Sequence, residues 1–137
     1  MEKQYINKFG NQIVFGINEF EKRINKTKAK MVDNKIDLLL ISSPANQFYL
    51  TGYDGWSFYT PQMVILSLDH KQPIWIGRAM DAVGAKFTAY IDKKNIIPYE
   101  DKYVASNKYH SMNFVVDFIK KKKWDKKTIG VEMDDYY

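Results

Sequence analysis

Residues 36–68 decide the fold of this chain, and they run IDLLLISS, PANQFYLTG, YDGWSFYTPQ, MVILSL. Two apolar runs, Ile36–Ile41 and Met63–Leu68, predict two strands. The segment 44–52 follows a Ser, starts with Pro and ends in Gly, which are the residues that favour the start and the left-handed stop of a short helix. Residues 53–62 place aromatic residues among small and polar ones, a pattern that neither a strand nor a helix requires, so we predict a loop.

The aromatic residues of this loop support two interpretations. Large aromatic side chains in a loop between strands indicate a ligand-binding site or a protein–protein interface. The commoner alternative is a small cluster that packs against the core. Only an exposed apolar patch is informative, and exposure cannot be deduced from the sequence, so both interpretations stay open at this point.

Upstream of residue 36, the spacing predicts one long helix. Asn18 is a good N-cap, and Glu21 stands three residues later, the spacing of a capping box. Apolar and half-polar side chains then recur at helical intervals up to about Asn34: Phe20, Ile24, Thr27 and Met31. Residues 1–17 are apolar without a period. We predict them to be an N-terminal arm on the domain or on a partner chain, and we place the domain at residues 18–137.

Downstream of residue 62, six elements are predicted. The strand 63–68 and residues 73–77 form a hairpin. A short helix carries Met80, Val83 and Phe87 on one face, and because Gly inside a helix costs ~1 kcal/mol relative to Ala, we expect a close packing contact at Gly84. A strand over 95–99, a polar loop, a helix over 108–123 and a strand over 128–133 complete the chain. The inner face of that last helix is predicted to hold Met112, Val115, Val116 and Ile119.

The order of these elements predicts the fold class. The strand 36–41 is apolar at consecutive positions, which is typical of a strand buried on both faces of a sheet by helices. Helices and strands alternate, with one hairpin among them. The sequence therefore predicts a layered α/β domain with a mixed sheet.

Composition and charge narrow the function classes. The 137 residues contain no Cys, and no apolar run approaches the ~20 residues of a membrane span. The N-terminus lacks a signal-peptide pattern, so we expect no membrane association and a cytoplasmic location. The net charge of +5 is concentrated in the Lys-rich block 120–127. Nucleic-acid binding is one interpretation, but we favour a solvated helix end and expect no nucleic-acid partner, because no recognised nucleic-acid module accompanies the block.

The chain offers few residues for catalysis. Its two His residues, His70 and His110, have no second ligand at a metal-binding spacing, so solvated or capping roles are favoured. The densest carboxylate group is Glu132, Asp134 and Asp135. Its two adjacent Asp residues could start a metal site, or they could cap a following helix. We predict no catalytic, metal-binding or cofactor-binding residue within the chain.

Four stretches carry a resemblance to a known family. They are Asn46-x-x-Tyr49-Leu50-Thr51-Gly52-Tyr53-Asp54-Gly55-Trp56-Ser57-Phe58-Tyr59, Gly77-Arg78-x-Met80-Asp81-Ala82-x-Gly84-Ala85, Asn95-Ile96-Ile97-x-Tyr99, and Ile129-Gly130-Val131-Glu132-Met133-Asp134-Asp135-Tyr136-Tyr137. The chain resembles the N-terminal domain of the creatinase, aminopeptidase P and prolidase superfamily of metallohydrolases. The first stretch looks most like the ectoine hydrolase branch. The resemblance implies a ribonuclease-H-like three-layer α/β/α sandwich with a mixed sheet.

The resemblance also implies where the chemistry would lie. In this family a larger catalytic domain follows, and in the peptidases two Asp, one His and two Glu of that domain hold a dinuclear centre of Mn, Co, Zn or Fe. None of those positions occurs in this sequence. We therefore expect this chain to be the N-terminal part of a longer hydrolase that cleaves a C–N bond in a small molecule such as ectoine or in an X-Pro dipeptide.

For the loop, the resemblance implies a role in trans. N-terminal domains of the family build a homodimer and lend this loop to the neighbouring subunit's active site. By position, Phe58 matches an aromatic that touches substrate in the creatinase branch, while a cationic residue of that branch is replaced around Thr60. Trp56, Phe58 and Tyr59 would suit a small zwitterionic substrate, since aromatic faces attract cations, so we predict substrate contacts at Trp56, Phe58, Tyr59 and Thr60. The alternative is a stand-alone small-molecule-binding or dimerisation module.

Overall fold

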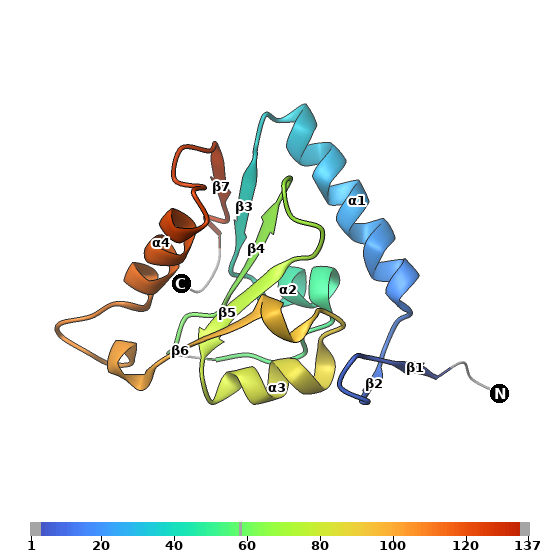
Figure 1. The fold of residues 1–137 in the computed structure, drawn as a ribbon, viewed down its shortest axis with the longest axis horizontal. Helices are drawn as coiled ribbons and strands as arrows, with labels where there is room; N and C mark the ends of the chain where they lie inside the picture. The colour runs from blue at the N-terminus through green and yellow to red at the C-terminus, as the bar shows by residue number, and fades with distance from the viewer. Residues whose placement is uncertain (1–3, 58, 135–137) are drawn as a thin grey trace.

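A five-stranded mixed sheet forms the middle layer of the protein (Figure 1). The structure is a computed structural model, and it describes residues 4–57 and 59–134. The strands stand in the order β6-β5-β4-β3-β7. Their bounds are Leu38–Ile41 for β3, Met63–Ser67 for β4, Ile74–Arg78 for β5, Ile96–Tyr99 for β6 and Ile129–Val131 for β7. The three central strands are antiparallel, and each outer strand runs parallel to its neighbour.

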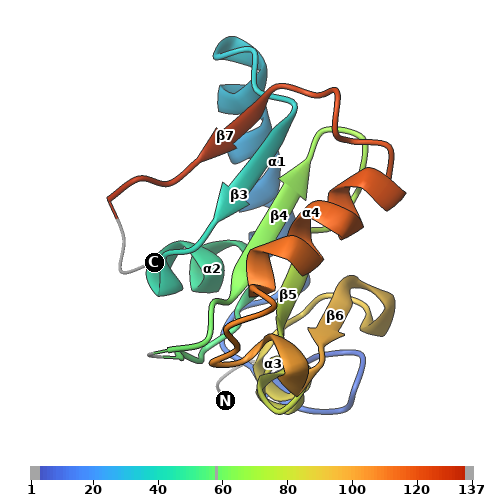
Figure 2. The same cartoon turned by 90° about the vertical axis from the view of Figure 1, so that its left-hand side faces the viewer.

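Helices cover both faces of this sheet. The helices are α1 (Ile17–Asp33), α2 (Pro44–Thr51), α3 (Asp81–Thr88) and α4 (Ser111–Lys121), with short 3₁₀ turns at Lys93–Asn95 and Asp101–Tyr103. In Figure 2, α4 lies in front of the sheet and α1 behind it. Side chains of the first three helices join one core cluster and those of α4 join the other. The predicted three-layer α/β/α sandwich with a mixed sheet is therefore confirmed.

Strand β3 shows why consecutive apolar residues were needed. Leu38 packs in the cluster on the α4 side, whereas Ile41 packs in the cluster on the α1 side. Side chains alternate between the faces of a strand, so a strand covered on both sides needs apolar residues at every position. Its antiparallel partner β4 repeats the pattern, with Ile65 and Leu66 on opposite faces.

The N-terminal segment forms a small ladder that the sequence did not predict. Strands β1 (Tyr5–Ile6) and β2 (Gln12–Ile13) pair antiparallel. The buried Asn7 Nδ2 donates a hydrogen bond to the carbonyl of Ala89 at 2.9 Å. Gly16 follows the ladder, and a Cβ there would lie 2.7 Å from a ring carbon of Tyr5. The helix begins directly after this close approach, so Gly16 is its N-cap and the prediction of Asn18 was wrong.

Helix α4 is shorter than predicted because its cap fixes its start. The helix begins at Ser111, and Nδ1 of His110 accepts the amide hydrogen bond of Met112 at 3.1 Å. The capping role proposed for His110 is thus confirmed. Val116, expected on the inner face, is 46% exposed, because the packing of Phe114 and Phe118 turns it outward. The first lysines of the basic block lie in the last turn of α4, as predicted for a helix end.

Helix α3 departs from expectation in a different way. Met80, Val83 and Phe87 do share one face, but all three are more than half exposed, and Ala82 and Ala85 occupy the buried side. A Cβ on Gly84 would meet no atom of the described chain within 4 Å. The close packing contact predicted for Gly84 is therefore absent from the domain.

None of the helices in the described part of the chain combines the length and the apolar character that crossing a bilayer requires.

Candidate functional site

The aromatic loop, residues 53–62, starts from a firmly held end. Helix α2 stops at Gly52, whose φ of 75° is the left-handed conformation predicted for it. Tyr53 is 3% exposed, so the first residue of the loop belongs to the core. The amide of Asp54 donates to Oγ1 of Thr88 on α3 at 3.0 Å. The start of the loop, residues 53 and 54, which we call its first leg, is thereby attached to the last turn of α3.

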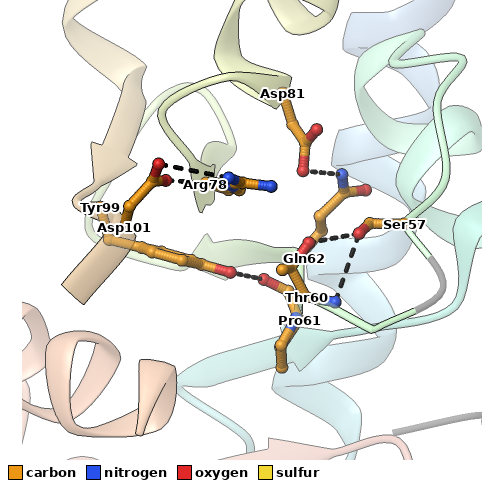
Figure 3. A network of polar contacts seen from close by, with 8 residues as sticks. All are labelled: Ser57, Thr60, Pro61, Gln62, Arg78, Asp81, Tyr99 and Asp101. Carbon is orange, nitrogen blue, oxygen red and sulfur yellow. Dashed lines mark hydrogen bonds and ion pairs between the residues drawn. The ribbon is translucent and has the colours of Figure 1, made fainter. Parts of the chain in front are cut away.

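Three further hydrogen bonds hold the other end of the loop, residues 60–62, which we call its second leg; the bonds from Tyr99 and to Asp81 are drawn in Figure 3. The hydroxyl of Tyr99 on β6 donates to the carbonyl of Pro61 at 2.6 Å. Nε2 of Gln62 donates to Oδ2 of Asp81 in the first turn of α3 at 3.0 Å, and the Gln62 carbonyl accepts from Nε2 of Gln47 at 3.1 Å. Both legs are therefore fixed to α3 and the sheet.

The predicted substrate-contact residues that the structure describes differ in their exposure to solvent. Trp56 is 53% exposed and Tyr59 is 70% exposed. Thr60 is only 2% exposed; its hydroxyl is hydrogen-bonded to that of Ser57, and its amide donates to the same Ser57 oxygen at 3.3 Å. Phe58 lies outside the described residues. In this structure Thr60 braces the loop, whereas Trp56 and Tyr59 present aromatic surface to solvent.

The two exposed rings line separate pockets. Trp56 lines a pocket of about 350 Å³ against the start of α2, together with Pro44, Phe48 and Tyr53. Tyr59 lines another of about 370 Å³, together with Tyr103, Tyr109 and His110. The structure therefore does not gather the predicted residues into one cavity. A ligand that touched both rings would have to span the loop from outside.

A third pocket adjoins the one at Tyr59, with Pro61 and His110 in both walls. It encloses about 330 Å³ beyond the carboxyl ends of the parallel strands β3 and β7. Its walls are mainly apolar, from Leu40, Met63, Met112 and Val131, with polar groups from Ser42, Gln62 and Glu132. Pockets of this size and make-up hold small molecules in many proteins, preferentially at the strand ends of α/β sheets.

One cation stands close to the loop. Nε and Nη2 of Arg78, at the end of β5, bind the two carboxylate oxygens of Asp101 at 2.8 and 3.2 Å. This hydrogen-bonded pair holds the pKa of Asp101 below its ordinary value of 3.8 and raises the pKa of Arg78. Figure 3 shows the guanidinium between Asp101 and the Asp81–Gln62 hydrogen bond. Arg78 thus keeps a permanent positive charge beside the second leg of the loop.

The carboxylate of Glu132 has a structural role. Its Oε2 accepts the amide hydrogens of Ser42 and Ser43 at 2.8 and 2.7 Å, and its Oε1 accepts from Nδ2 of Asn46 at 2.5 Å. Ser43 is the N-cap residue of α2, as predicted, but its own side chain makes no capping bond. Glu132 supplies the cap from the end of β7. This contact involves Glu132 alone, and the sequence did not predict it.

The described residues do not fit a metal centre. Within residues 4–57 and 59–134, no group of three or more His, Cys, Asp or Glu side chains comes together. Asp134 is exposed, and Asp135 lies outside the described residues. The ring of His70 is hydrogen-bonded to Oδ1 of Asn95 at 3.1 Å. No catalytic step is assigned to a metal here.

Sequence reasoning missed the partners of Tyr59. Tyr103 lies in the segment predicted only as a polar loop, Tyr109 lies in the predicted helix 108–123, and His110 was predicted only as a solvated or capping residue. Their approach to the aromatic loop depends on the path of the chain after β6. A recurrence of Tyr at 99, 103 and 109 was the available signal, because Tyr suits half-buried surfaces.

Comparison with known proteins places the chain among hydrolase domains. The model of the Creatinase/Prolidase N-terminal domain matches residues 23–136. Ectoine hydrolase from Halomonas elongata is 43% identical over 120 residues, and an uncharacterized hydrolase/peptidase, y4tM, from Sinorhizobium fredii is 41% identical over 119 residues. Each alignment covers 87% of this chain. The chain spans only 30% of the length of these curated relatives.

Solved structures share the fold at low sequence identity. An XXA-pro aminopeptidase from Streptococcus pyogenes superposes with a TM-score of 0.61 at 19% identity, covering 86% of this chain and 77% of the other. A proline dipeptidase from Streptococcus agalactiae gives 0.56 at 14% identity, covering 82% and 94%. At these identities the likeness establishes the fold alone.

Proposed function

The chain belongs to the Creatinase/Prolidase N-terminal domain family, and from this premise we propose that it is the non-catalytic N-terminal domain of a metal-dependent hydrolase. In this proposal the domain takes part in a homodimer and presents the aromatic loop to the active site of the neighbouring subunit. The metal is held outside the described residues, by the catalytic part of the enzyme. The role of the present chain is to position side chains.

One observation carries the proposal. The loop exposes Trp56 and Tyr59, yet both of its legs are tied to α3 by hydrogen bonds near 3.0 Å. Exposed aromatic side chains on a fixed backbone suit recognition, because little conformational freedom is lost when they bind. A loop that only covered its own core would bury these rings.

The parent reaction proposed is hydrolysis of a C–N bond. Ectoine hydrolase is the named relative with 43% identity, so opening of the ectoine ring is the first candidate reaction. Cleavage of an X-Pro dipeptide is the second, since proteins of that kind share the fold. Trp56 and Tyr59 would hold the cationic end of such a substrate through their ring faces.

The test uses the full-length protein that contains this chain. Replacement of Trp56 or Tyr59 by Ala should lower kcat/KM for ectoine about two- to thirtyfold, the range of one cation–aromatic contact. Tyr49→Ala is the matched control, because Tyr49 is a partly exposed aromatic on α2 that packs under Arg23, away from the loop tip. Loss of activity on dilution, in step with dissociation of the dimer, should show that the loop acts in trans. Unchanged kinetics in both loop variants would contradict the proposal.

The 330 Å³ pocket between β3, β7 and α4 favours a second candidate, a stand-alone small-molecule-binding module. This alternative predicts that the 137-residue chain alone gains thermal stability with a ligand from a small-molecule screen. It also predicts that Met63→Trp, which would fill the pocket, abolishes that gain. A chain whose melting temperature no compound raises would contradict the alternative.

A further inference from the structure

Helix α3 has its large apolar side chains on the outside. Met80, Val83 and Phe87 are 63%, 53% and 56% exposed, whereas the buried positions are the small Ala82 and Ala85. A surface helix of a single domain ordinarily turns its large apolar side chains to the core. We name the exposed set the α3 face: Ala79, Met80, Val83, Gly84 and Phe87. It contains no charged residue, which is typical of the centre of a protein–protein interface.

Gly84, at the middle of this face, has no close packing contact with the described part of the chain. It lies within a regular helix, where Gly is about 1 kcal/mol less favourable than Ala. Because a Cβ there would touch nothing within 4 Å, no contact of the described chain requires the absence of a side chain. A close approach of a partner surface to the helix backbone would explain why position 84 carries Gly.

The α3 face is continuous with the aromatic loop. Asp81 and Thr88, in the first and last turns of α3, hold the two legs of the loop. The C-terminal end of α3 is itself held in place, since Asn7 Nδ2 donates hydrogen bonds to the carbonyls of Lys86 and Ala89 at 3.1 and 2.9 Å. In both views α3 and the loop lie at the same end of the sheet (Figures 1 and 2). A body docked on α3 is therefore placed next to Trp56 and Tyr59.

We propose that the α3 face is the surface on which the catalytic part of the neighbouring subunit docks. This inference rests on the proposed function and names the contact that would deliver the loop. Two arguments select this occupant. Both legs of the loop are tied to α3, so the body that receives the loop is also the body that lies against the α3 face. In addition, the relatives extend well beyond the region that this chain matches, which provides a partner of sufficient size.

The first experiment measures the dimer dissociation constant of a variant in the α3 face and of a matched control variant. In the full-length protein, Phe87→Glu should raise the dimer Kd about tenfold or more in sedimentation velocity, because it buries a charge in the apolar contact. Val32→Glu is the matched control, since Val32 is 60% exposed on the last turn of α1, at the opposite end of the molecule from α3. The control should leave the Kd unchanged.

Gly84→Ala separates docking from folding. In the 137-residue chain this change should raise the Tm by about 2–4 °C, because Ala favours the helix and meets no atom. In the full-length protein the same change should weaken the dimer by about tenfold, because the added methyl blocks the close approach. A variant that merely damaged the fold would lower both the Tm of the 137-residue chain and the affinity of the full-length dimer.

The outcomes distinguish this inference from the proposed function. An active full-length dimer whose Kd neither variant changes would refute the α3 face and leave the role of the loop standing. A full-length protein that is monomeric and fully active would refute the proposed function itself. If the 137-residue chain dimerises alone and Phe87→Glu abolishes that dimer, the occupant is a second copy of this chain and the proposal is overturned.

Discussion

The carboxylate of Glu132 offers a quantitative test of how the fold holds the loop. It accepts two backbone amides at the start of α2, from Ser42 and Ser43, and the side-chain amide of Asn46. The acceptor and the donors stand about 90 positions apart in the chain. Glu132→Ala therefore removes the N-cap of α2 and a link between the end of β7 and the end of β3.

The magnitude follows from these contacts. Loss of an N-cap costs about 0.5–2 kcal/mol, and a hydrogen bond to a charged group contributes about 1.5–3 kcal/mol. Because the site is only partly buried, water can replace part of what is lost. We therefore expect Glu132→Ala to lower the free energy of unfolding by about 2–3 kcal/mol. Glu132→Gln keeps an acceptor oxygen but loses the charge at the helix N-terminus, so about 1 kcal/mol is expected.

The assay is urea unfolding of the 137-residue chain, followed by circular dichroism and by tryptophan fluorescence. Asp134→Ala is the matched control, because Asp134 is an exposed carboxylate two residues further on, and its replacement should change stability by less than about 0.5 kcal/mol. A double-mutant cycle with Asn46→Ala should show a coupling energy of at least about 0.5 kcal/mol. If Glu132→Ala were no more destabilising than Asp134→Ala, the assignment of Glu132 as the cap of α2 would be wrong.

Three further predictions concern the supports of the site. Tyr99→Phe removes the 2.6 Å hydrogen bond to the Pro61 carbonyl and should cost about 1 kcal/mol in urea unfolding, with faster amide exchange in the loop. Asn7→Ala leaves two amides and the Ala89 carbonyl without this partner, while the Lys86 carbonyl keeps its bond from Asn11, and should cost about 2–3 kcal/mol; a loss below about 0.5 kcal/mol would show that the N-terminal ladder does not support α3. Arg78 lowers the pKa of Asp101, so this pair stabilises the fold above the unfolded pKa of about 3.9, and the contribution is lost as the pH falls through the lower folded pKa. In Arg78→Met an NMR titration should find the Asp101 pKa back near 3.8, and an unchanged value would refute the pairing.

The course of residues 36–68 could be predicted because its signals are local. Gly52 stops α2 in the left-handed conformation, and Ser43 is its N-cap. The apolar residues at 38–41 demand cover on both faces, and both core clusters are present. These features depend on backbone conformation and on the alternation of side chains, which neighbouring residues alone specify.

The candidate site could be predicted only in part. Local chemistry identified the aromatic loop, and Trp56 and Tyr59 are exposed on it. That Thr60 is buried depends on Ser57 and on how the second leg is pinned by Tyr99 and Gln62, contacts that span 3 to 38 positions. Sequence periodicity placed Met80, Val83 and Phe87 on one face of α3 but could not say which way that face turns.

By itself, then, the sequence determined the helices, the five strands of the main sheet, their order and the family, because capping residues, apolar spacing and motif order are properties of short segments. Only the tertiary structure decided what each element faces: that Glu132 caps a helix distant in sequence, that α3 holds both legs of the loop, and that the apolar side of α3 lies outside. The physical reason is that burial is a property of the whole packed chain. At α3 the small Ala82 and Ala85 are buried, and the larger apolar side chains are turned toward solvent.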